Sequence, residues 1–359
     1  MNNTIQSFKI FISFFLLFLC TSCETKNVKD IPFNQFKDVY QVYGKKLNVD
    51  TYKFSTYGKM LLFEKEEYII RENFKSESLI DKIYYTKDSL ISLVKFGQGP
   101  NENLSSRIIQ KHSDTCFSIF DGKRKTILFK DISGNTLFES KFSELFFSAI
   151  QTNDGYLATG IFDKQNKHRY ILYDQKGNKI QSFGYYPQEE EEIDITSKNL
   201  AYQGSLVYNK TLNRFLSTTN NGCVLELYQL GEKPYLIQGY YDILPVYAPH
   251  KTKKIDGVRY GDDNQCGYID LYATEQYVYG LYSGKKLENR TTQGLVDAIQ
   301  TNHILIYDWN GNCVCRLVTD KPLFNICVSQ DNQELIALGW EDDYYLYSFD
   351  LSEVNLSNN

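Results

Sequence analysis

The sequence predicts an all-β fold, a six-bladed β-propeller of four-stranded antiparallel blades. Tyr and Phe, which favour strands, number 29 and 23 among 359 residues, whereas Met numbers 2 and Pro 7. Short alternating runs of apolar and polar residues are bounded by turn residues, and beyond residue 23 no segment shows a sustained helical period. A strand-and-turn unit also recurs at the spacing of one propeller blade, about 40–45 residues.

Residues 1–22 are interpreted as a signal peptide. The ten residues Ile10–Leu19 form an apolar run that is too short to span a bilayer. Small residues at positions 21 and 22 precede Cys23, the arrangement of a bacterial lipoprotein signal, in which this cysteine receives the lipid. Cys20 is a poorer acceptor because bulky Leu19 would lie beside the cleavage point. We therefore predict lipidation of Cys23, with an ordinary secretory signal as the alternative.

The remaining chain is divided into three parts. The polar stretch 23–35 is predicted to be a tether, and a flexible chain of that length spans roughly 15–20 Å. Residues 36–353 form the propeller and residues 354–359 a disordered tail. These boundaries predict an outer membrane lipoprotein of the cell envelope, on either its periplasmic face or the cell surface.

Four segments carry the repeated unit, each with a strand that ends in an aromatic residue close to an aspartate. They are Cys116–Ser140, Gly160–Gly184, Asn302–Val318 and Asp343–Glu353. The equivalent aspartates, at positions 131, 174, 308 and 350, are separated by 43, 134 and 42 residues. The middle interval is close to three repeats, so the units are spaced like propeller blades.

The motif Asp-x-x-Gly-Asn begins at Asp131, Asp174 and Asp308. An aspartate accepts hydrogen bonds from the backbone two residues further on, and the glycine can adopt the positive φ that closes a hairpin. A calcium loop would need several converging oxygens and a bidentate acid at its far end. The motif is therefore interpreted as a structural turn.

The number of blades follows from the length of the repeat region. Residues 38–353 could hold seven units, but Tyr240–Cys266 is irregular and resembles an insertion. Removing it leaves six, with seven blades as the alternative. A strand within Val39–Phe54 is expected to complete the blade that contains Tyr344–Asp350, because ring closure removes exposed strand edges.

Charge and motifs exclude several functions. With 39 basic and 44 acidic residues, the net charge is −5, and the sequence contains no basic stripe for nucleic acid. The standard hydrolase motifs His-Glu-x-x-His and Gly-x-Ser-x-Gly are absent, so no catalytic residue is assigned. The run Gly97–Pro100 lacks the spacing of a phosphate-binding loop and is interpreted as a tight turn.

The cysteines and histidines predict no metal or cofactor. The four histidines are His112, His168, His250 and His303, and His168 lies in a charged hairpin turn, Lys167–Arg169, that we expect to be solvated. Six cysteines follow Cys23 without a framework spacing: Cys116, Cys223, Cys266, Cys313, Cys315 and Cys327. Buried reduced thiols are expected, with one disulfide that involves Cys327, on a strand next to Cys315, as the alternative.

Two loops are candidate interaction surfaces. Gln188–Glu192 carries four consecutive acids, which are usual in a solvated loop but could dock a basic partner. The insertion mixes aromatic and charged residues, and long loops on rigid scaffolds often bind partners. Its candidate ligand or partner residues are Tyr247, His250, Arg259 and Tyr260, although a variable surface loop is the alternative.

The segment LISLVKFGQGPNEN (Leu90–Asn103) resembles the Gly-x-Gly-Pro-x-Glu turn of the TolB-like six-blade propeller lipoproteins common in Bacteroidetes. Gly267–Asn289 and His303–Leu317 are also similar to that family. The sequence departs at Asn101, where the family more often has Gly, and at Asn103, where it often has Phe. The resemblance implies the fold and the exported compartment but no established activity, so it assigns no functional residue.

Our leading functional hypothesis is a non-enzymatic binding or scaffold module in the cell envelope, anchored to the membrane by its N-terminal lipid. It would present one face or the channel mouth to an envelope protein, a peptide or a glycan, without a cofactor. The alternative is a hydrolase or lyase that acts on a saccharide or lactone at the propeller axis. Converging carboxylates or histidines in the channel would favour that enzyme.

Overall fold

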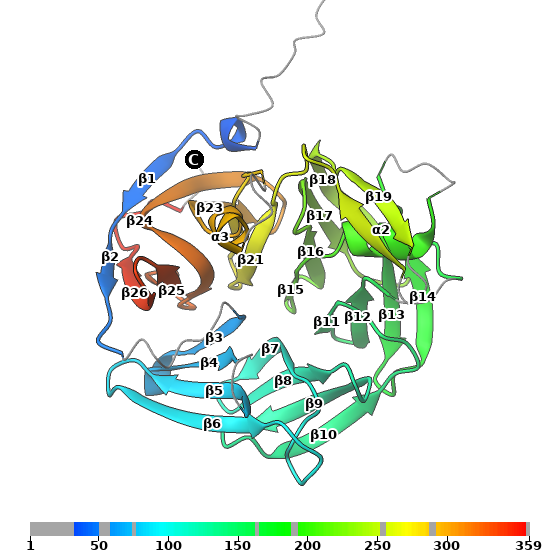
Figure 1. Cartoon of the computed structure of the whole chain (residues 1–359), viewed down its shortest axis with the longest axis horizontal. Helices are drawn as coiled ribbons and strands as arrows, with labels where there is room; N and C mark the ends of the chain where they lie inside the picture. The colour runs from blue at the N-terminus through cyan, green and yellow to red at the C-terminus, as the bar shows by residue number, and fades with distance from the viewer. Residues whose placement is uncertain are drawn as a thin grey trace, which may run out of the picture.

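The computed structural model describes residues 32–49, 58–73, 77–161, 165–187, 193–251, 256–286 and 292–356. Its antiparallel blades surround a central axis, and the chain passes once around the ring from the N-terminus to the C-terminus (Figure 1). The sheets make six blades, which confirms the predicted propeller and shows that the seven-bladed alternative is wrong.

Blades 1 to 4 are separate sheets whose strands follow chain order from the axis outward. Blade 1 contains β3 (Met60–Phe63), β4 (Tyr68–Glu72), β5 (Ser78–Tyr84) and β6 (Ser89–Lys95). Blade 2 contains β7 (Arg107–Ser113), β8 (Cys116–Asp121), β9 (Thr126–Asp131) and β10 (Thr136–Lys141). Blade 3 contains β11 (Ser148–Gln151), β12 (Gly155–Thr159), β13 (Tyr170–Asp174) and β14 (Lys179–Phe183). Blade 4 contains β15 (Leu206–Asn209), β16 (Arg214–Thr218), β17 (Cys223–Gln229) and β18 (Tyr235–Ile243).

Blades 5 and 6 share one long strand. Blade 5 contains β21 (Tyr268–Ala273), β22 (Tyr277–Tyr282), β23 (Thr301–Asp308) and the first half of β24 (Cys313–Val328). The second half of β24 is the inner strand of blade 6, which continues through β25 (Glu334–Trp340) and β26 (Tyr344–Asp350). Cys315 pairs with β23 and Cys327 with β25. The expectation that Cys327 lies on a neighbouring strand was therefore wrong, because β24 continues from one blade into the next.

The N-terminal segment closes the ring. β2 (Gly44–Lys46) pairs antiparallel with β26 as the outer strand of blade 6, which confirms the expected closure. β1 (Val39–Val42) pairs in parallel with β24 on blade 5 instead, so only part of the expected segment completes the last blade. Each inner strand also contacts the next, in the cyclic order β3, β7, β11, β15, β21, β24 and back to β3. In Figure 1 the blue N-terminal strands lie beside the orange and red C-terminal ones.

The apolar core is distributed between the blades. One cluster of buried side chains joins blades 1, 5 and 6, and further clusters lie between blades 1 and 2, 2 and 3, 3 and 4, and 4 and 5. Since each blade contributes apolar side chains to both of its neighbours, we infer that no blade can bury its two faces alone.

The two ends of the propeller differ. At the end where the inner strands finish, every connection between strands has five residues or fewer, including η4 (Glu64–Glu66). At the end where they begin, the longer connections hold α2 (Ile195–Ala201), α3 (Thr292–Ala298) and the hairpin of β19 (Tyr247–Lys251) and β20 (Asp256–Tyr260). This hairpin is the predicted insertion, but residues 240–243 belong to β18 of blade 4.

The ordered domain is longer than expected at both ends. Phe33, in η2 (Phe33–Gln35), makes an edge contact with the ring of Tyr282, at 5.7 Å between centroids. Val354 and Leu356 pack against the largest core cluster, and the Leu356 carbonyl accepts a hydrogen bond from Tyr277 Oη at 2.6 Å. The described parts of the expected tether and tail therefore belong to the folded domain, because their apolar side chains cover the core.

The Asp-x-x-Gly-Asn motifs form the predicted turns. Asp174 Oδ1 accepts hydrogen bonds from the backbone N–H groups of Lys176 and Asn178, both at 2.8 Å, and Gly177 has φ +84°. A Cβ at Gly177 would lie 2.0 Å from the carbonyl oxygen of Lys141 on blade 2. The repeated glycine therefore permits both the turn and close packing against the preceding blade.

We expect Gly177→Ala to lower the free energy of unfolding by about 1–3 kcal/mol, because it adds positive-φ strain and a backbone clash. Gly231→Ala is the matched control, since a Cβ there meets no atom within 4 Å. Urea unfolding checks both variants, and equal stabilities would contradict this role of the turn.

A buried ion pair joins blades 3 and 4. Arg169 Nη1 lies 2.6 Å from Glu226 Oε2, and the two side chains are 1% and 2% exposed. Glu226 also accepts hydrogen bonds from Tyr170 Oη at 2.6 Å and Tyr241 Oη at 2.8 Å. The expectation that Lys167–Arg169 forms a solvated turn is thus wrong for Arg169, because Glu226 supplies the buried counter-charge.

Replacing Glu226 with Gln should destabilise the fold by about 3–5 kcal/mol, because it leaves the Arg169 charge buried without its counter-ion. Asp263→Asn is the control: Asp263 Oδ1 lies 2.6 Å from Lys286 Nζ, but this pair is exposed and should contribute nothing measurable. Urea unfolding of both variants measures the difference. A stable Glu226→Gln protein would show that the blades do not depend on this pair.

Candidate functional site

A cavity of about 560 Å³ occupies the central channel. It is lined mainly by residues at the ends of the inner strands β7, β11, β15 and β21 and in the short turns that follow them. We call it the mouth cavity. Its volume falls in the range of small-molecule sites, and its lining includes Gln110, His112, Gln151, Tyr208, Glu275 and Gln330.

Polar contacts join the turns around the mouth at every blade interface. The donors and acceptors, from the interface of blades 1 and 2 onward, are Lys111 Nζ to Leu62 O (2.9 Å), Gln151 N to Gln110 Oε1 (3.0 Å), Asn153 N to Tyr208 Oη (3.1 Å), Asn209 Nδ2 to Glu275 O (2.8 Å), Thr274 Oγ1 to Asn332 Oδ1 (2.8 Å) and Gln330 N to Glu64 Oε1 (2.6 Å). We call this set the rim. It fixes the positions from which side chains reach the cavity.

Several amide groups at the mouth have unused hydrogen-bonding capacity. Within the described part of the chain, the side-chain amides of Gln151 and Gln330 and the Nε2 group of Gln110 form no hydrogen bond. All three residues line the cavity. Each amide can donate and accept, so the mouth offers neutral polar groups to a ligand.

Charged residues of both signs line the cavity, and Lys210 and Glu275 are among them. Asp114 receives Lys65 Nζ at 2.6 Å and Lys111 Nζ at 3.1 Å, and these contacts lower the pKa of its carboxyl. Lys59 also lines the cavity; burial lowers the pKa of its ammonium, while the nearby acids Asp270 and Glu72 oppose that shift. The cavity is therefore polar without a large net charge.

Asp270 is buried next to the cavity-lining residue Lys59 and connects three blades through hydrogen bonds. Its Oδ2 accepts hydrogen bonds from the N–H of Ile326 at 3.0 Å and from Asn325 Nδ2 at 3.2 Å. Asn325 Oδ1 in turn accepts one from the N–H of Gly58 at 2.9 Å. Burial raises the pKa of Asp270, and the charge of Lys59 opposes that shift. These contacts give Asp270 a structural role in joining blades 5, 6 and 1.

His112 is the histidine of the mouth cavity. One ring nitrogen, Nε2, lies 2.8 Å from Ser118 Oγ, and the ring packs at a tilt of 31° against Phe129, with 4.8 Å between centroids. Burial, aided by the charge of Lys210, lowers the pKa of His112 to about 4. The imidazole is therefore neutral at pH 7. Within the described ranges, no three or more His, Cys, Asp or Glu side chains are placed to hold a metal ion.

The four insertion residues do not form one surface. Tyr247 pairs with Tyr260 across the hairpin, so their side chains share one face, whereas His250 and Arg259 belong to the other. His250 and Arg259 are exposed. Figure 1 shows β19 beside α2 on the outer side of blade 4.

Tyr247 and Tyr260 attach the hairpin to the propeller. Tyr247 packs on the cluster around Tyr202, with the ring centroids 6.4 Å apart. Tyr260 Oη donates to the carbonyl of Leu200 in α2 at 3.0 Å and accepts from Asn221 Nδ2 at 3.0 Å. Of the predicted set, only His250 and Arg259 remain available to a partner on the outer face.

The other sites singled out from the sequence do not converge. All six described cysteines are free; of the expected buried thiols, Cys223, Cys315 and Cys327 are buried, whereas the other three are partly exposed. His303 packs against Phe33, and its pKa is lowered to about 4 by burial and by the charge of Arg316. Cys23 and the acidic run 188–192 lie outside the described residues. No described helix combines the length and apolar character needed to cross a membrane.

The turn that carries the family resemblance is structural. Glu102 Oε2 accepts the backbone N–H of Gly99 at 2.8 Å, and a Cβ at Gly97 would lie 2.0 Å from that oxygen. Asn101 has φ +62°, a conformation that Gly or Asn tolerates, and its Oδ1 accepts the N–H of Thr136 at 2.9 Å. The departure from Gly at position 101 is thus compatible with the turn.

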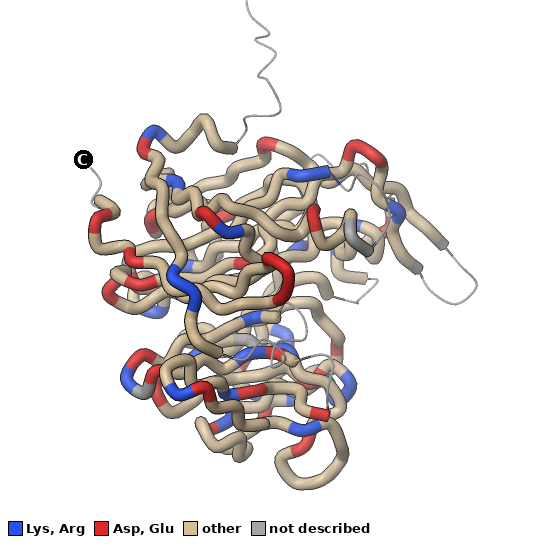
Figure 2. Tube along the Cα trace, turned by 60° about the vertical axis from the view of Figure 1, so that its left-hand side comes forward, with Lys and Arg blue, Asp and Glu red and all other residues tan. Residues whose placement is uncertain are grey.

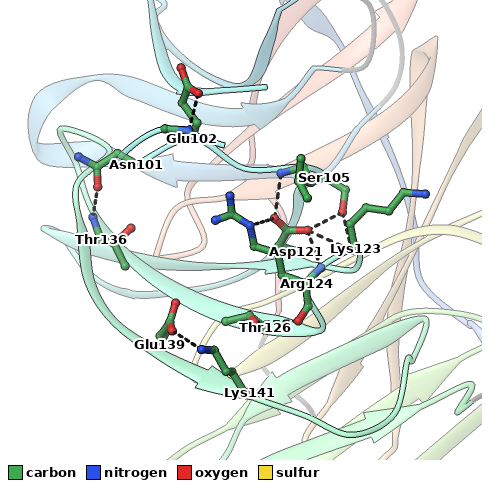
Figure 3. A network of polar contacts seen from close by, with 12 residues as sticks. Asn101, Glu102, Ser105, Asp121, Lys123, Arg124, Thr126, Thr136, Glu139 and Lys141 are labelled. Carbon is green, nitrogen blue, oxygen red and sulfur yellow. Dashed lines mark hydrogen bonds and ion pairs between the residues drawn. The ribbon is translucent and has the colours of Figure 1, made fainter. Parts of the chain in front are cut away.

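A buried aspartate connects this turn to the body of blade 2. Asp121 accepts hydrogen bonds from Leu104 N at 2.9 Å, Ser105 Oγ at 3.0 Å and Lys123 N at 3.0 Å. Figure 3 shows Ser105, Lys123 and Arg124 gathered around Asp121, while Asn101 is bonded separately to Thr136, and none of these residues lines the cavity. The motif therefore stabilises the fold and does not form the mouth.

The mouth residues carry no distinctive signal in the sequence. Gln151, Asn153 and Lys210 follow short apolar strands and look like ordinary turn residues there. These residues line one cavity only because the turn after each inner strand lies near the axis of the propeller. Insertions of unequal length between the strands, such as those that contain α2 and α3, hide that periodicity.

The fold agrees with known proteins. Residues 60–331 match the TolB-like 6-blade propeller-like family, and the chain belongs to it. A member of the DUF4221 family from Bacteroides vulgatus has a TM-score of 0.57 at 11% identity, over 87% of this chain and 96% of that one. A candidate exported protein from Bacteroides fragilis has a TM-score of 0.52 at 11% identity, over 87% and 99%. These similarities show the fold alone, and no curated protein matches the sequence.

His112 predicts a pH dependence of stability. Its folded pKa, about 4, lies below the unfolded value of 6.5, so the unfolded state takes up the proton first as the pH falls. Wild-type protein should lose up to about 3 kcal/mol through this group between pH 6.5 and 4. His112→Phe, which retains the aromatic ring next to Phe129, should lack this loss. The free energy of unfolding is measured for both proteins from pH 6.5 to 4. A difference between the two proteins that stays constant over this range would contradict the lowered pKa of His112.

Proposed function

We propose that the protein is an exported, lipid-anchored binding module of the bacterial cell envelope, held by Cys23 in the outer membrane, that presents the mouth cavity to a glycan, a peptide or an envelope protein. The observation that carries the proposal is the cavity itself. It combines a rigid rim, uncommitted amide groups and charges of both signs without a large net charge, which suits recognition of a neutral polar ligand.

Two observations support export and anchoring. The apolar run Ile10–Leu19 precedes the small residues and Cys23, as in a lipoprotein signal. The structurally similar Bacteroides fragilis protein is itself a candidate exported protein. Figure 2 shows basic and acidic residues interspersed along the trace of the described chain, and in this view they form no continuous basic stripe of the kind a nucleic-acid partner would require.

The position of the N-terminal segment supports an outward-facing mouth. Phe33 contacts Tyr282, which pairs with Tyr268 at the start of β21, whereas the cavity lies where β21 ends. Eight residues lie between Cys23 and Pro32, and the nine Cα–Cα steps from one to the other extend at most about 30 Å. Such a tether would hold the opposite end of blade 5 near the membrane and leave the mouth turned away from it.

Lipidation is tested by metabolic labelling with an alkyne palmitate analogue in a bacterium that processes lipoproteins. Wild-type protein and Cys20→Ala should incorporate label into the membrane fraction, whereas Cys23→Ala should incorporate none. Label retained in Cys23→Ala and lost in Cys20→Ala would move the anchor to Cys20. Absence of label in all three proteins would contradict anchoring.

The binding surface is tested by placing the photocrosslinker p-benzoylphenylalanine at single exposed positions in cells. We expect adducts from Lys210 at the mouth and none from Gln41, an exposed residue of β1 on the outer edge of blade 5 that serves as the control. Adducts from His250 alone would assign binding to the hairpin instead. The absence of adducts at all three positions would contradict the proposed binding role.

A further inference from the structure

We infer that the ligand of the mouth cavity is a neutral saccharide, recognised by the carboxamides of Gln110, Gln151 and Gln330 against the ring of Tyr208. This inference rests on the proposed function, since it names the ligand class of the same cavity. The contributing residues come from blades 2, 3, 4 and 6, and only closure of the ring brings them together.

The hydrogen-bonding groups match hydroxyl chemistry. The amides of Gln151 and Gln330 each offer two donor hydrogens and one acceptor oxygen, with none of these used by another described residue. Gln110 uses its Oε1 atom to accept the N–H of Gln151 and leaves its NH₂ group available. A sugar hydroxyl both donates and accepts, so a ligand rich in hydroxyls can satisfy such groups without burying a charge.

Tyr208 supplies a fixed aromatic wall. Its hydroxyl donates to Asn213 Oδ1 at 2.7 Å and accepts the backbone N–H of Asn153 at 3.1 Å. These two bonds hold the side chain in place before a ligand arrives, so little conformational entropy is lost on binding. The partly exposed ring lines the cavity and can pack on the apolar face of a sugar ring.

The charge distribution favours a neutral ligand over a peptide terminus. Asp114 is already paired with Lys65 and Lys111, so its carboxylate is not free to receive a cationic peptide end. Lys59, deeper in the wall, faces the nearby acids Asp270 and Glu72. A charged peptide end would lose hydration on entering the cavity and would meet lining charges of both signs, among them Lys210 and Glu275, instead of one matching counter-charge.

The test uses the full-length lipidated protein in a detergent without a sugar head group. Saturation-transfer NMR is recorded with maltose, cellobiose, lactose and N,N′-diacetylchitobiose, and with trialanine as the peptide probe. We expect saturable transfer to at least one disaccharide and none to trialanine. Gln151→Leu and Gln330→Leu should each weaken that disaccharide at least about fivefold, the loss of one net hydrogen bond.

Gln41→Leu is the matched control, because Gln41 is exposed on β1 outside the cavity and its loss should leave affinity unchanged. The mouth variants should fold normally, since the amides they remove form no hydrogen bond within the described protein; their thermal unfolding midpoints check this. Binding of trialanine that depends on Gln151, binding of no disaccharide, or affinities unchanged in both mouth variants would overturn the inference. If crosslinks from Lys210 persist in any of these cases, the binding role survives and only the ligand class is wrong.

Discussion

Ring closure is the constraint on which the rest of the structure depends. A propeller blade buries its two faces only against its neighbours, so the first and last blades must meet for either to be stable. Here closure has two parts: β2 adds the outer strand to blade 6, and β24 serves as the outer strand of blade 5 and the inner strand of blade 6. The rim also closes the ring, because its hydrogen bonds cross all six blade interfaces and the last one joins Gln330 of blade 6 to Glu64 of blade 1.

Closure also explains why the two ends of the propeller differ in what they can do. The end with short turns is tied at each interface and surrounds a preformed cavity. The other end accommodates the hairpin, the two helices and the N-terminal segment, where insertions do not disturb the rim. A rigid site at one end and the N-terminal segment at the other is a division that suits the tethered binding module proposed above.

Local residue patterns predicted the fold well. The repeated Asp-x-x-Gly-Asn motif encodes both a turn and an inter-blade contact, so its spacing along the chain is also the spacing of the blades. The patterns failed where the burial of a residue depends on a partner that is distant in the sequence. Arg169 in the charged turn is buried because Glu226, 57 residues away, neutralises it. Tyr247 was expected to contact a partner, but it packs inward and attaches the hairpin to the propeller. The mouth could not be predicted, since residues such as Gln151 and Gln330 become neighbours of one cavity only through closure.

We propose that recognition occurs at the mouth. Hydrogen–deuterium exchange, compared for the purified protein with and without a solubilised extract of its own envelope, tests this most directly. If recognition occurs there, protection should increase only in the mouth turns around residues 151–154, 208–211 and 273–276, while exchange of the hairpin 247–260 stays unchanged. Protection of the hairpin with unaltered mouth turns would contradict it.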